Sequence, residues 1–318
     1  MWRVVPLSSL ALSLSGFSIA SETPVFTIET VLAALRDSHP EAARVSDQLP
    51  AGVVAREDLT YADRNEHALH LDLYRPACND LLPAVLLIHG GGWVAGDRQM
   101  ERPFAKRLAS RGYVTVPVSY RLGVDGRFPA PVHDLKAAVR WLRAQAGEFG
   151  IDSSRIGAVG ASAGGTLATM LGVTNDLAEM EGREGSPGFS SAVQAVVDID
   201  GTVTFMDNAL IQNAENVPGP YWEYVHGTYS SSRAIWLAAS PLYYVSRRSA
   251  PTLFIKSSAP EPVLAGRDEM AGRLDILGID AASVKFPDTP HTFWLVHPWF
   301  ARTVDETDAF LRKHLKKR

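Results

Sequence analysis

Cysteine is almost absent from this chain of 318 residues, which contains only Cys78. A single cysteine cannot form a disulfide within the chain, and it excludes a metal site built from several thiolates. His67 and His70 lie close together, but no clustered aspartate or third ligand accompanies them. We therefore interpret them as surface histidines and expect no metal.

A large excess of charge of either sign is also missing. The chain carries 31 Lys and Arg against 35 Asp and Glu, for a net charge of −4. This composition lacks the overall basic character of a nucleic-acid-binding protein. The basic run at 312–318 is placed where it would complement a helix C-terminus and continue as a solvated tail.

No apolar run reaches the roughly 20 residues that cross a bilayer as a helix. The N-terminus instead has the pattern of a secretory signal: Arg3, then an uncharged apolar stretch at 4–19, then small residues ending at Ala20. We expect a signal peptide at 1–20, a single mature domain at 21–318, and a secreted or periplasmic protein without stable membrane insertion. A retained anchor is the alternative.

Internal repeats and low-complexity linkers are missing as well, and what is present is an alternation of short apolar runs with helical patterns. This alternation predicts an α/β fold with a mostly parallel central sheet covered by helices on both faces. An antiparallel pair at 53–61 and 68–74 is expected at the sheet edge. The other expected strands are 83–88, 113–118, 155–159, 193–199, 252–255 and 283–286; expected helices include 25–39, 102–110 and 134–146.

The chain is organised around the small-residue stretch Gly160–Gly165, which follows an apolar strand and opens a helical pattern. In such a turn the central Ser162 takes a strained backbone conformation and projects its hydroxyl, while the flanking glycines let strand and helix approach closely. The N–H of Ala163 faces the same space and can stabilise an oxyanion. Ser162 is therefore a candidate nucleophile.

A second glycine-rich stretch, His89–Trp93, follows the strand expected at 83–88. Three consecutive glycines after a buried strand let backbone N–H groups turn into a cavity. We predict that Gly91 and Gly92 supply the second half of an oxyanion hole, with a merely flexible turn as the alternative.

These motifs, together with Ser119–Leu122 and Pro129–Asp134, resemble those of α/β-hydrolase esterases of the hormone-sensitive-lipase and feruloyl/acetyl-esterase type. Within that group the chain is similar to secreted bacterial carbohydrate-esterase-like hydrolases. The resemblance runs from about Asp72 to the C-terminus. It implies the α/β-hydrolase fold and a catalytic order of serine, then acid, then histidine.

The resemblance implies that His291, after the last expected strand, is the base that accepts the Ser162 proton. His297 and His133 are the alternatives. The acid is expected in the segment after the strand at 252–255, where Glu261 has the nearest spacing and Asp268 matches the carbohydrate-esterase-like pattern. We favour Asp268, although a helix N-cap is its alternative role.

Two further carboxylates, Asp198 and Asp200, follow the preceding strand. We rank them below Asp268 and Glu261 as the triad acid. Their expected role is to shape the floor of the pocket or to hold the neighbouring loop.

An aromatic insertion at 202–232 lies on the side of the sheet where α/β enzymes bind ligands. It is predicted to be a lid or substrate rim, or else a small cap packed on the core. Trp93, Tyr221 and Trp222 are the expected substrate contacts, since aromatic faces stack on sugar rings.

The expected function is a secreted serine esterase that works through an acyl-enzyme, without a cofactor, on acetyl or feruloyl esters of plant polysaccharide. The competing hypotheses are a peptidase or amidase on the same fold and a binding protein that has lost its acid. The sequence does not specify an oligomeric state.

Overall fold

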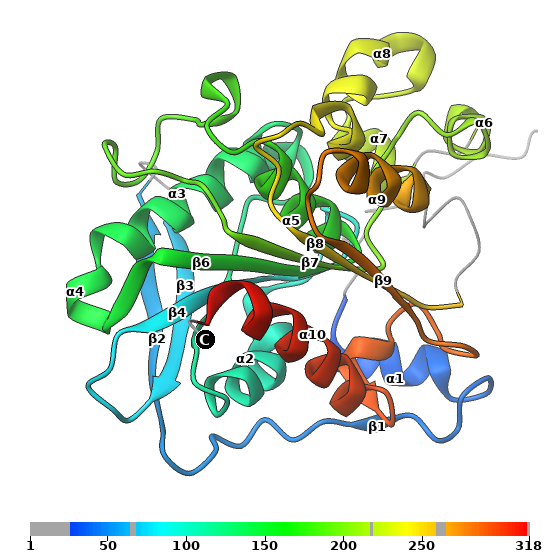
Figure 1. Cartoon of the computed structure of the whole chain (residues 1–318). Helices are drawn as coiled ribbons and strands as arrows, with labels where there is room; N and C mark the ends of the chain where they lie inside the picture. Colours follow the sequence, from blue (N-terminus) through cyan, green and yellow to red (C-terminus); the bar gives the residue numbers. More distant parts are fainter. Residues whose placement is uncertain (1–25, 64–67, 217–218, 259–264, 317–318) are drawn as a thin grey trace, which may run out of the picture.

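A computed structural model of the protein describes residues 26–63, 68–216, 219–258 and 265–316. Its centre is an eight-stranded sheet in the order β2-β3-β5-β4-β6-β7-β8-β9 (Figure 1). The pairs β2–β3 and β3–β5 are antiparallel, and every later pair is parallel. The predicted α/β-hydrolase sheet with an antiparallel edge is therefore confirmed.

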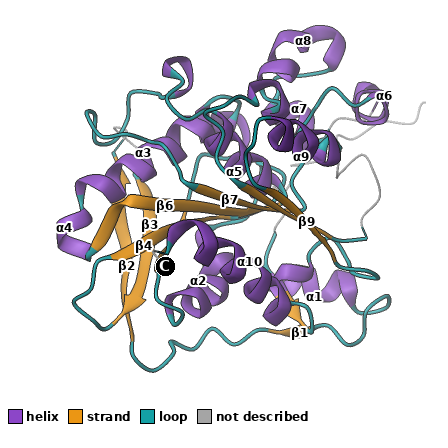
Figure 2. Ribbon diagram, viewed as in Figure 1, coloured by secondary structure: helices purple, strands orange, loops and turns teal. Residues whose placement is uncertain are grey.

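The strands of this sheet are β2 Val53–Ala62, β3 Leu69–Pro76, β4 Leu82–Ile88, β5 Val114–Val118, β6 Ile151–Ala161, β7 Ala195–Ile199, β8 Thr252–Lys256 and β9 Ala281–Lys285. A separate two-stranded sheet pairs β1, Ala43–Arg44, with β10, Val296–His297. Figure 2 shows the large sheet as a twisted layer enclosed by helices.

The α-helices are α1 Ile28–Leu35, α2 Arg102–Ala109, α3 Ala130–Ala144, α4 Ala146–Phe149, α5 Ala163–Val173, α6 Asn208–Asn216, α7 Pro220–Tyr224, α8 Tyr229–Ala238, α9 Arg267–Ile276 and α10 Phe300–Leu315. Helix α3 begins before its expected start at Asp134, because Pro131 stands in its first turn, where a missing N–H is tolerated. None of the helices in the described ranges is long and apolar enough to cross a membrane.

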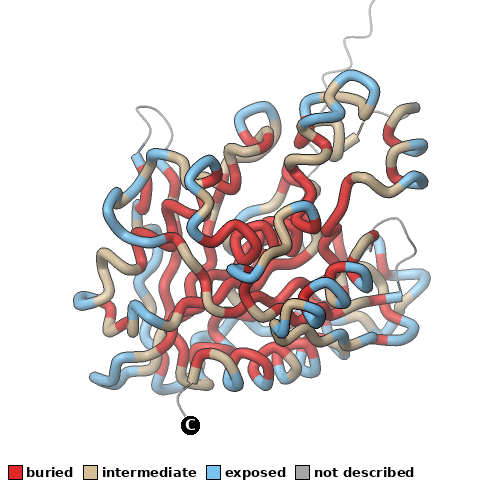
Figure 3. The backbone as a smooth tube through the Cα atoms, turned by 45° about the horizontal axis from the view of Figure 1, so that its top comes forward, coloured by how far each residue is buried: buried red, intermediate tan, exposed pale blue. Residues whose placement is uncertain are grey.

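The sheet is buried on both faces, which explains its nearly continuous apolar strands. Along β4, Leu86 and Ile88 pack toward α3 and α5, while Val85 and Leu87 pack toward α2 and α10. Figure 3 shows buried chain through the centre of the molecule and exposed chain along the outer loops and helix surfaces. This rigid double-sided core holds the ends of the strands in fixed positions.

The N-terminal part of the described chain is a strap across one side of the molecule (Figure 1). Val31 and Leu35 of α1 are buried, in agreement with the expected helix packed on the main body. Further along, Ala43 pairs with His297 in the β1–β10 ladder. The strap thereby fixes the segment that follows the predicted catalytic histidine.

The aromatic insertion forms α6, α7 and the start of α8. Phe205 and Tyr224 are almost completely buried within it. Trp236, further along α8, is also buried, and its indole N–H donates to the Gly227 carbonyl of the insertion at 3.1 Å. Of the two predicted roles, the structure therefore favours a small cap packed on the core over a loose lid.

Candidate active site

Ser162 lies at the sharp turn between β6 and α5, with φ of 54° and ψ of −122°. The turn is possible only with glycines beside it. A Cβ on Gly160 would lie 2.0 Å from the Gly164 carbonyl oxygen, and one on Gly164 would lie 2.1 Å from the Ile88 oxygen. This strained left-handed backbone in a packed turn is the predicted nucleophile elbow.

His291 follows β9 and brings its ring to the serine, as the sequence predicts. Its Nε2 lies 2.9 Å from the Ser162 Oγ, and the ring makes a T-shaped contact with the Trp294 indole. The alternatives are elsewhere: His297 is exposed in β10, and His133 lies in α3. Ser162 and His291 are therefore joined as a nucleophile and base would be.

The carboxylate that contacts the His291 ring belongs to Asp200. The prediction that Asp268 makes this contact is wrong. The Nδ1 of His291 lies 3.0 Å from Oδ2 of Asp200. Asp268 has a side chain that is 89% exposed and pairs with Lys256 at the end of β8. Glu261 lies outside the described residues. The acid thus comes from the end of β7, one strand earlier than expected.

The end of β7 places Asp200 beside the nucleophile because β6 and β7 are parallel neighbours. The N–H of Ser162 donates to the Ile199 carbonyl at 2.8 Å, and Asp200 then turns with φ of 52°. Its second oxygen, Oδ1, accepts from the Ser257 N–H at 2.8 Å. Both carboxylate oxygens therefore have donors, and the side chain is held in one orientation.

Burial alone would raise the pKa of Asp200, but the hydrogen bond from His291 and the charge of Arg267 outweigh it and hold the pKa below its usual range. Asp200 is therefore ionised at neutral pH. An ionised carboxylate on Nδ1 keeps the proton of a neutral imidazole on that nitrogen and leaves Nε2 free to accept.

A second buried carboxylate, Asp198, lies on the same strand. It accepts from the Thr169 hydroxyl at 2.9 Å, from the Gly201 N–H at 2.6 Å and from Arg267 at 3.0 Å. Burial raises its pKa, opposed first by Arg267. The prediction that Asp198 shapes the pocket floor or holds a loop agrees with these contacts.

Asp198 and Asp200 could have been singled out from the sequence by their context. Asp198 interrupts an otherwise apolar strand, Ala195–Ile199, near its carboxyl end, and Asp200 follows the strand directly. A buried charge needs a partner, so charged residues in a strand buried on both faces indicate a polar site.

The predicted oxyanion loop lies against the nucleophile. A Cβ on Gly90 would lie 3.1 Å from the Ser162 Cβ. Gly91 and Gly92 have φ of 112° and 62°, and a Cβ on Gly91 would meet the Ala95 carbonyl oxygen at 2.1 Å. The loop therefore requires glycine, as expected of a turn that presents backbone N–H groups.

His89 supports this loop through contacts with Tyr120 and Gly90. Its ring stacks on Tyr120 with centroids 4.4 Å apart, and its Nδ1 lies 2.8 Å from the Gly90 carbonyl oxygen. The Tyr120 hydroxyl donates to the His89 carbonyl at 2.8 Å. Burial lowers the pKa of His89 to about 4, so the ring is neutral and serves as a structural support.

An ion pair joins Ser119–Leu122 to Pro129–Asp134, two of the motifs that carry the resemblance to esterases. Arg121 donates to the buried carboxylate of Asp134 through Nε at 2.8 Å and through its terminal nitrogen at 2.7 Å. This bidentate pair ties the segment after β5 to α3.

The three aromatic residues expected to contact substrate lie close together but are not equally accessible. Trp93 is only 4% exposed and stacks on Tyr224 with ring centroids 4.4 Å apart. Phe205 and Tyr221 also lie against this ring, so Trp93 is covered in this structure, and its role as a substrate contact stays a prediction. Tyr221 and Trp222 are partly exposed and stay candidates for the rim.

The cap also touches the oxyanion loop directly. A Cβ on Gly92 would lie 2.9 Å from the Cβ of Pro220, the first residue of α7. Two contacts, Trp93 with Tyr224 and Gly92 with Pro220, thus connect the insertion to the predicted oxyanion hole.

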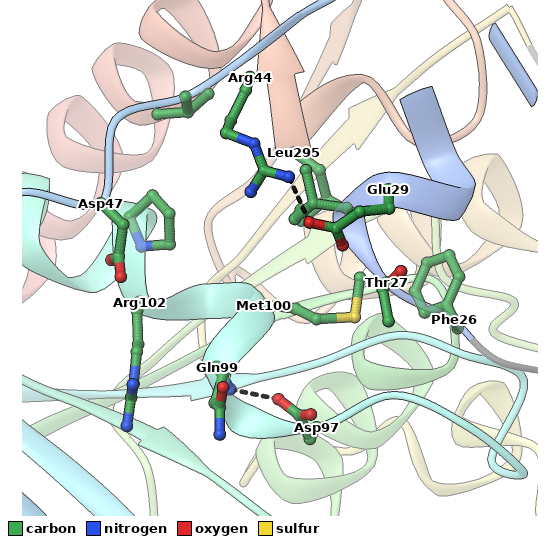
Figure 4. Close-up of a pocket in the computed structure, with 13 residues that line it drawn as sticks. Phe26, Thr27, Glu29, Arg44, Asp47, Asp97, Gln99, Met100, Arg102 and Leu295 are labelled. Carbon is green, nitrogen blue, oxygen red and sulfur yellow. Dashed lines mark hydrogen bonds and ion pairs between the residues drawn. The ribbon is translucent and has the colours of Figure 1, made fainter. Parts of the chain in front are cut away.

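A pocket with a volume of about 240 Å³ lies between α1, the strap and the start of α2. Figure 4 shows the residues that line it. Glu29 pairs with Arg44 on its wall, and the N–H of Gln99 donates to Asp97 at 2.6 Å. Ser162, His291 and Asp200 are not among its lining residues. This pocket is therefore separate from the candidate active site.

A metal centre is not suggested by the described residues, which contain no group of three or more His, Cys, Asp or Glu that could hold an ion. The contacts at Ser162, His291 and Asp200 form a hydrogen-bonded line of nucleophile, base and acid. Such a line can activate a hydroxyl for attack on a carbonyl carbon.

The chain is similar to known esterases in sequence and in structure. Esterase LipC of Mycobacterium tuberculosis is 32% identical over 208 residues, which cover 64% of this chain and 51% of LipC. Ethyl acetate hydrolase of Pseudomonas putida is 31% identical over 244 residues, 74% of each chain. The chain thus spans about half the length of LipC and three quarters of the hydrolase.

Among solved structures, a bifunctional GH43-CE of Bacteroides eggerthii superposes with a TM-score of 0.70 at 28% identity, covering 81% of this chain and 38% of that one. The family model described as BD-FAE matches residues 71–267, a range that includes the oxyanion loop, the elbow and Asp200. The chain therefore belongs to the BD-FAE family of α/β-hydrolase esterases.

Proposed function

We propose that this protein is a serine esterase that hydrolyses carboxylic esters through an acyl-enzyme. The observation that carries the proposal is the line from Asp200 through His291 to Ser162, with contacts of 3.0 Å and 2.9 Å. Similarity to named esterases, ethyl acetate hydrolase among them, supports the same reaction.

In the proposed reaction Ser162 Oγ attacks the ester carbonyl while His291 Nε2 takes its proton. The imidazolium that forms is stabilised by Asp200 and then gives its proton to the leaving alkoxide. Water, deprotonated by the same ring, attacks the acyl-enzyme and releases the acid. Each step uses only groups of the protein, the ester and water.

The negative oxygen of each tetrahedral intermediate is assigned to the N–H groups of Gly91, Gly92 and Ala163. Ala163 begins α5 directly after the nucleophile, so its N–H also belongs to the positive end of a helix. The contact of Gly90 with Ser162 supports the placement of the glycine loop.

The substrate class proposed is an acylated plant polysaccharide, with acetyl or feruloyl as the acyl group. The support comes from the similarity to the GH43-CE protein and from the partly exposed Tyr221 and Trp222 near the cap. We also propose that the protein is exported by the signal at 1–20, which lies outside the described residues.

The competing hypothesis of a degenerate binding protein depended on the irregular acid loop around Glu261. Asp200 now supplies a carboxylate to His291, so that reason no longer applies. For the amidase alternative, matched ester and anilide substrates would decide, with hydrolysis of the ester expected to be much faster.

The test of the proposed function is a chromogenic short-chain ester assay on the purified protein and on Ser162→Ala. The variant should lose more than roughly three decades of kcat while keeping its fold. A serine-directed phosphonate should label Ser162 in the native chain. An active alanine variant, or labelling at another residue, would refute the proposal.

A further inference from the structure

We infer that Arg267 is a positioning residue of the catalytic line, holding the ionised Asp198 and Asp200 together so that His291 faces a single net negative charge. This inference deepens the proposed esterase function and depends on it. Arg267 itself touches neither the serine nor the histidine in any contact found among the described residues.

Arg267 is 1% exposed, which is unusual for an arginine and requires partners for its guanidinium. One terminal nitrogen lies 3.0 Å from Asp198 Oδ1, and the other lies 3.5 Å from Asp200 Oδ1. The Nε–H donates to the Gly201 carbonyl at 2.7 Å. The side chain therefore bridges both carboxylates and the peptide that follows them.

The chain places Arg267 there through a turn that only glycine accommodates well. Gly266 precedes α9 with φ of 79°, and a Cβ on it would lie 2.6 Å from the Thr204 side chain. The first residue of the helix then points into the core, while the next, Asp268, points to solvent. Successive residues on a helix differ in direction by about 100°, so the two neighbours face opposite environments.

The charges explain why a cation is needed. Asp198 and Asp200 are two buried carboxylates on one strand end, and like charges in low dielectric raise each other's proton affinity. Burial raises the pKa of Asp198, but both of its oxygens accept hydrogen bonds from Thr169, Gly201 and Arg267, so we assign it the ionised form. With Arg267 the set then carries one net negative charge. When His291 takes the serine proton, the whole set becomes neutral, which stabilises the charge that forms during the reaction.

Among the described residues, the other hydrogen-bond partners of the two carboxylates are neutral donors: the Thr169 hydroxyl from α5 and the N–H groups of Gly201 and Ser257. In the same part of the chain, His291 is the remaining titratable group in contact with Asp200. Lys256 is turned to Asp268. The Trp294 indole contacts the His291 ring and also interacts with Glu101, whose pKa burial raises to about 8.

The test compares the pH dependence of kcat/KM for the full chain and for Arg267→Gln. Without the cation, and with Asp198 and Asp200 still ionised, either His291 holds its proton more strongly or Asp200 takes one up. Both changes move the acid limb of the profile, the range where kcat/KM falls as the pH is lowered, to higher pH by about one unit or more. We also expect kcat/KM to fall about 100-fold at its maximum, since the ring is less well oriented. Arg267→Lys, which keeps the charge, should leave the acid limb close to that of the native protein.

Asp198→Asn should shift the acid limb in the opposite direction to Arg267→Gln, and it leaves the buried Arg267 cation in place. It takes away one negative charge, so the acid limb should move to lower pH. In the double variant Asp198→Asn with Arg267→Gln the net charge equals that of the native set, and the limb should return toward its native position. If Arg267 had a merely structural role, the variants would fold less well or show a lower maximum kcat/KM, without these opposite shifts of the acid limb.

If Arg267→Gln does not fold, the Asp198→Asn profile decides alone. An acid limb that stays in place in Asp198→Asn, or moves the same way in both single variants, overturns the inference. Failure of the proposed function would look different, because the native protein would then hydrolyse no ester or Ser162→Ala would remain active.

Discussion

Oδ2 of Asp200 accepts a hydrogen bond from Nδ1 of His291 at 3.0 Å, although the two residues lie 91 positions apart in the chain. Asp200 follows β7, while His291 follows β9. The contact spans the carboxyl ends of three parallel strands and closes the line that ends at Ser162. The carboxylate that contacts His291 is therefore on a different strand end from the one that motif spacing indicates.

The first prediction separates the two candidate acids. Asp200→Asn should lower kcat by about four decades, because the amide cannot hold the required tautomer or stabilise the imidazolium. Asp268→Asn is the matched control, since it makes the same chemical change at an exposed site and should leave kcat nearly unchanged. Steady-state kinetics with a chromogenic ester measures both. A large loss in Asp268→Asn with a small one in Asp200→Asn would contradict the assignment.

The second prediction concerns the ring that supports Trp93. The Tyr224 ring stacks on Trp93, and its hydroxyl is buried without a hydrogen-bond partner in the described part of the chain. Tyr224→Phe should therefore be neutral or slightly stabilising. Tyr224→Ala should lower the free energy of unfolding by about 3–5 kcal/mol, and should reduce kcat because Trp93 adjoins Gly91 and Gly92.

Urea unfolding of the two Tyr224 variants provides the comparison. Tyr243→Ala is a control, because Tyr243 is 59% exposed and should matter little. Equal stability of Tyr224→Ala and Tyr224→Phe would show that the stacked ring does not support the loop.

The third prediction is a pH dependence of stability that originates at Glu101. Burial raises the pKa of Glu101 from 4.5 to about 8. Between these values the folded state binds the proton and the unfolded state does not, so stability falls as pH rises. The slope is up to about 1.4 kcal/mol per pH unit. Glu101→Gln cannot ionise and should lack this contribution.

Unfolding free energies of the native protein and Glu101→Gln should therefore be similar near pH 4. The variant should become progressively more stable than the native protein toward about pH 8. Glu148→Gln, at an exposed position on α4, serves as the matched control. A constant difference across this range would exclude a buried carboxyl that holds its proton.

The fourth prediction concerns processing of the N-terminus. The signal pattern predicts a mature chain that begins near Ser21 and lies outside the cytoplasm. Mass spectrometry of the natively expressed protein gives the first residue directly, and cell fractionation gives its location. Retention of Met1 or Trp2 on a cytoplasmic product would contradict the prediction.

The sequence by itself determined the fold class and the pairing of Ser162 with His291, which are proposed as nucleophile and base. The elbow at Ser162 is encoded locally, because glycines at fixed offsets are the only residues that allow the turn. Strands buried on both faces leave apolar runs such as 83–88 that are visible without a structure. His291 was accessible because the order of catalytic residues along the chain follows from the order of the strands.

Which carboxylate contacts His291, how the cap packs and where the Arg267 side chain lies were decided only by the tertiary structure. Whether Asp200 or Asp268 reaches His291 depends on which strand ends lie side by side, and on which residue of α9 faces inward. A pairing through space between distant segments leaves no periodic pattern in the sequence. Trp93 likewise has an aromatic side chain of the kind that contacts substrates, and only the packing of the cap against it removes it from solvent.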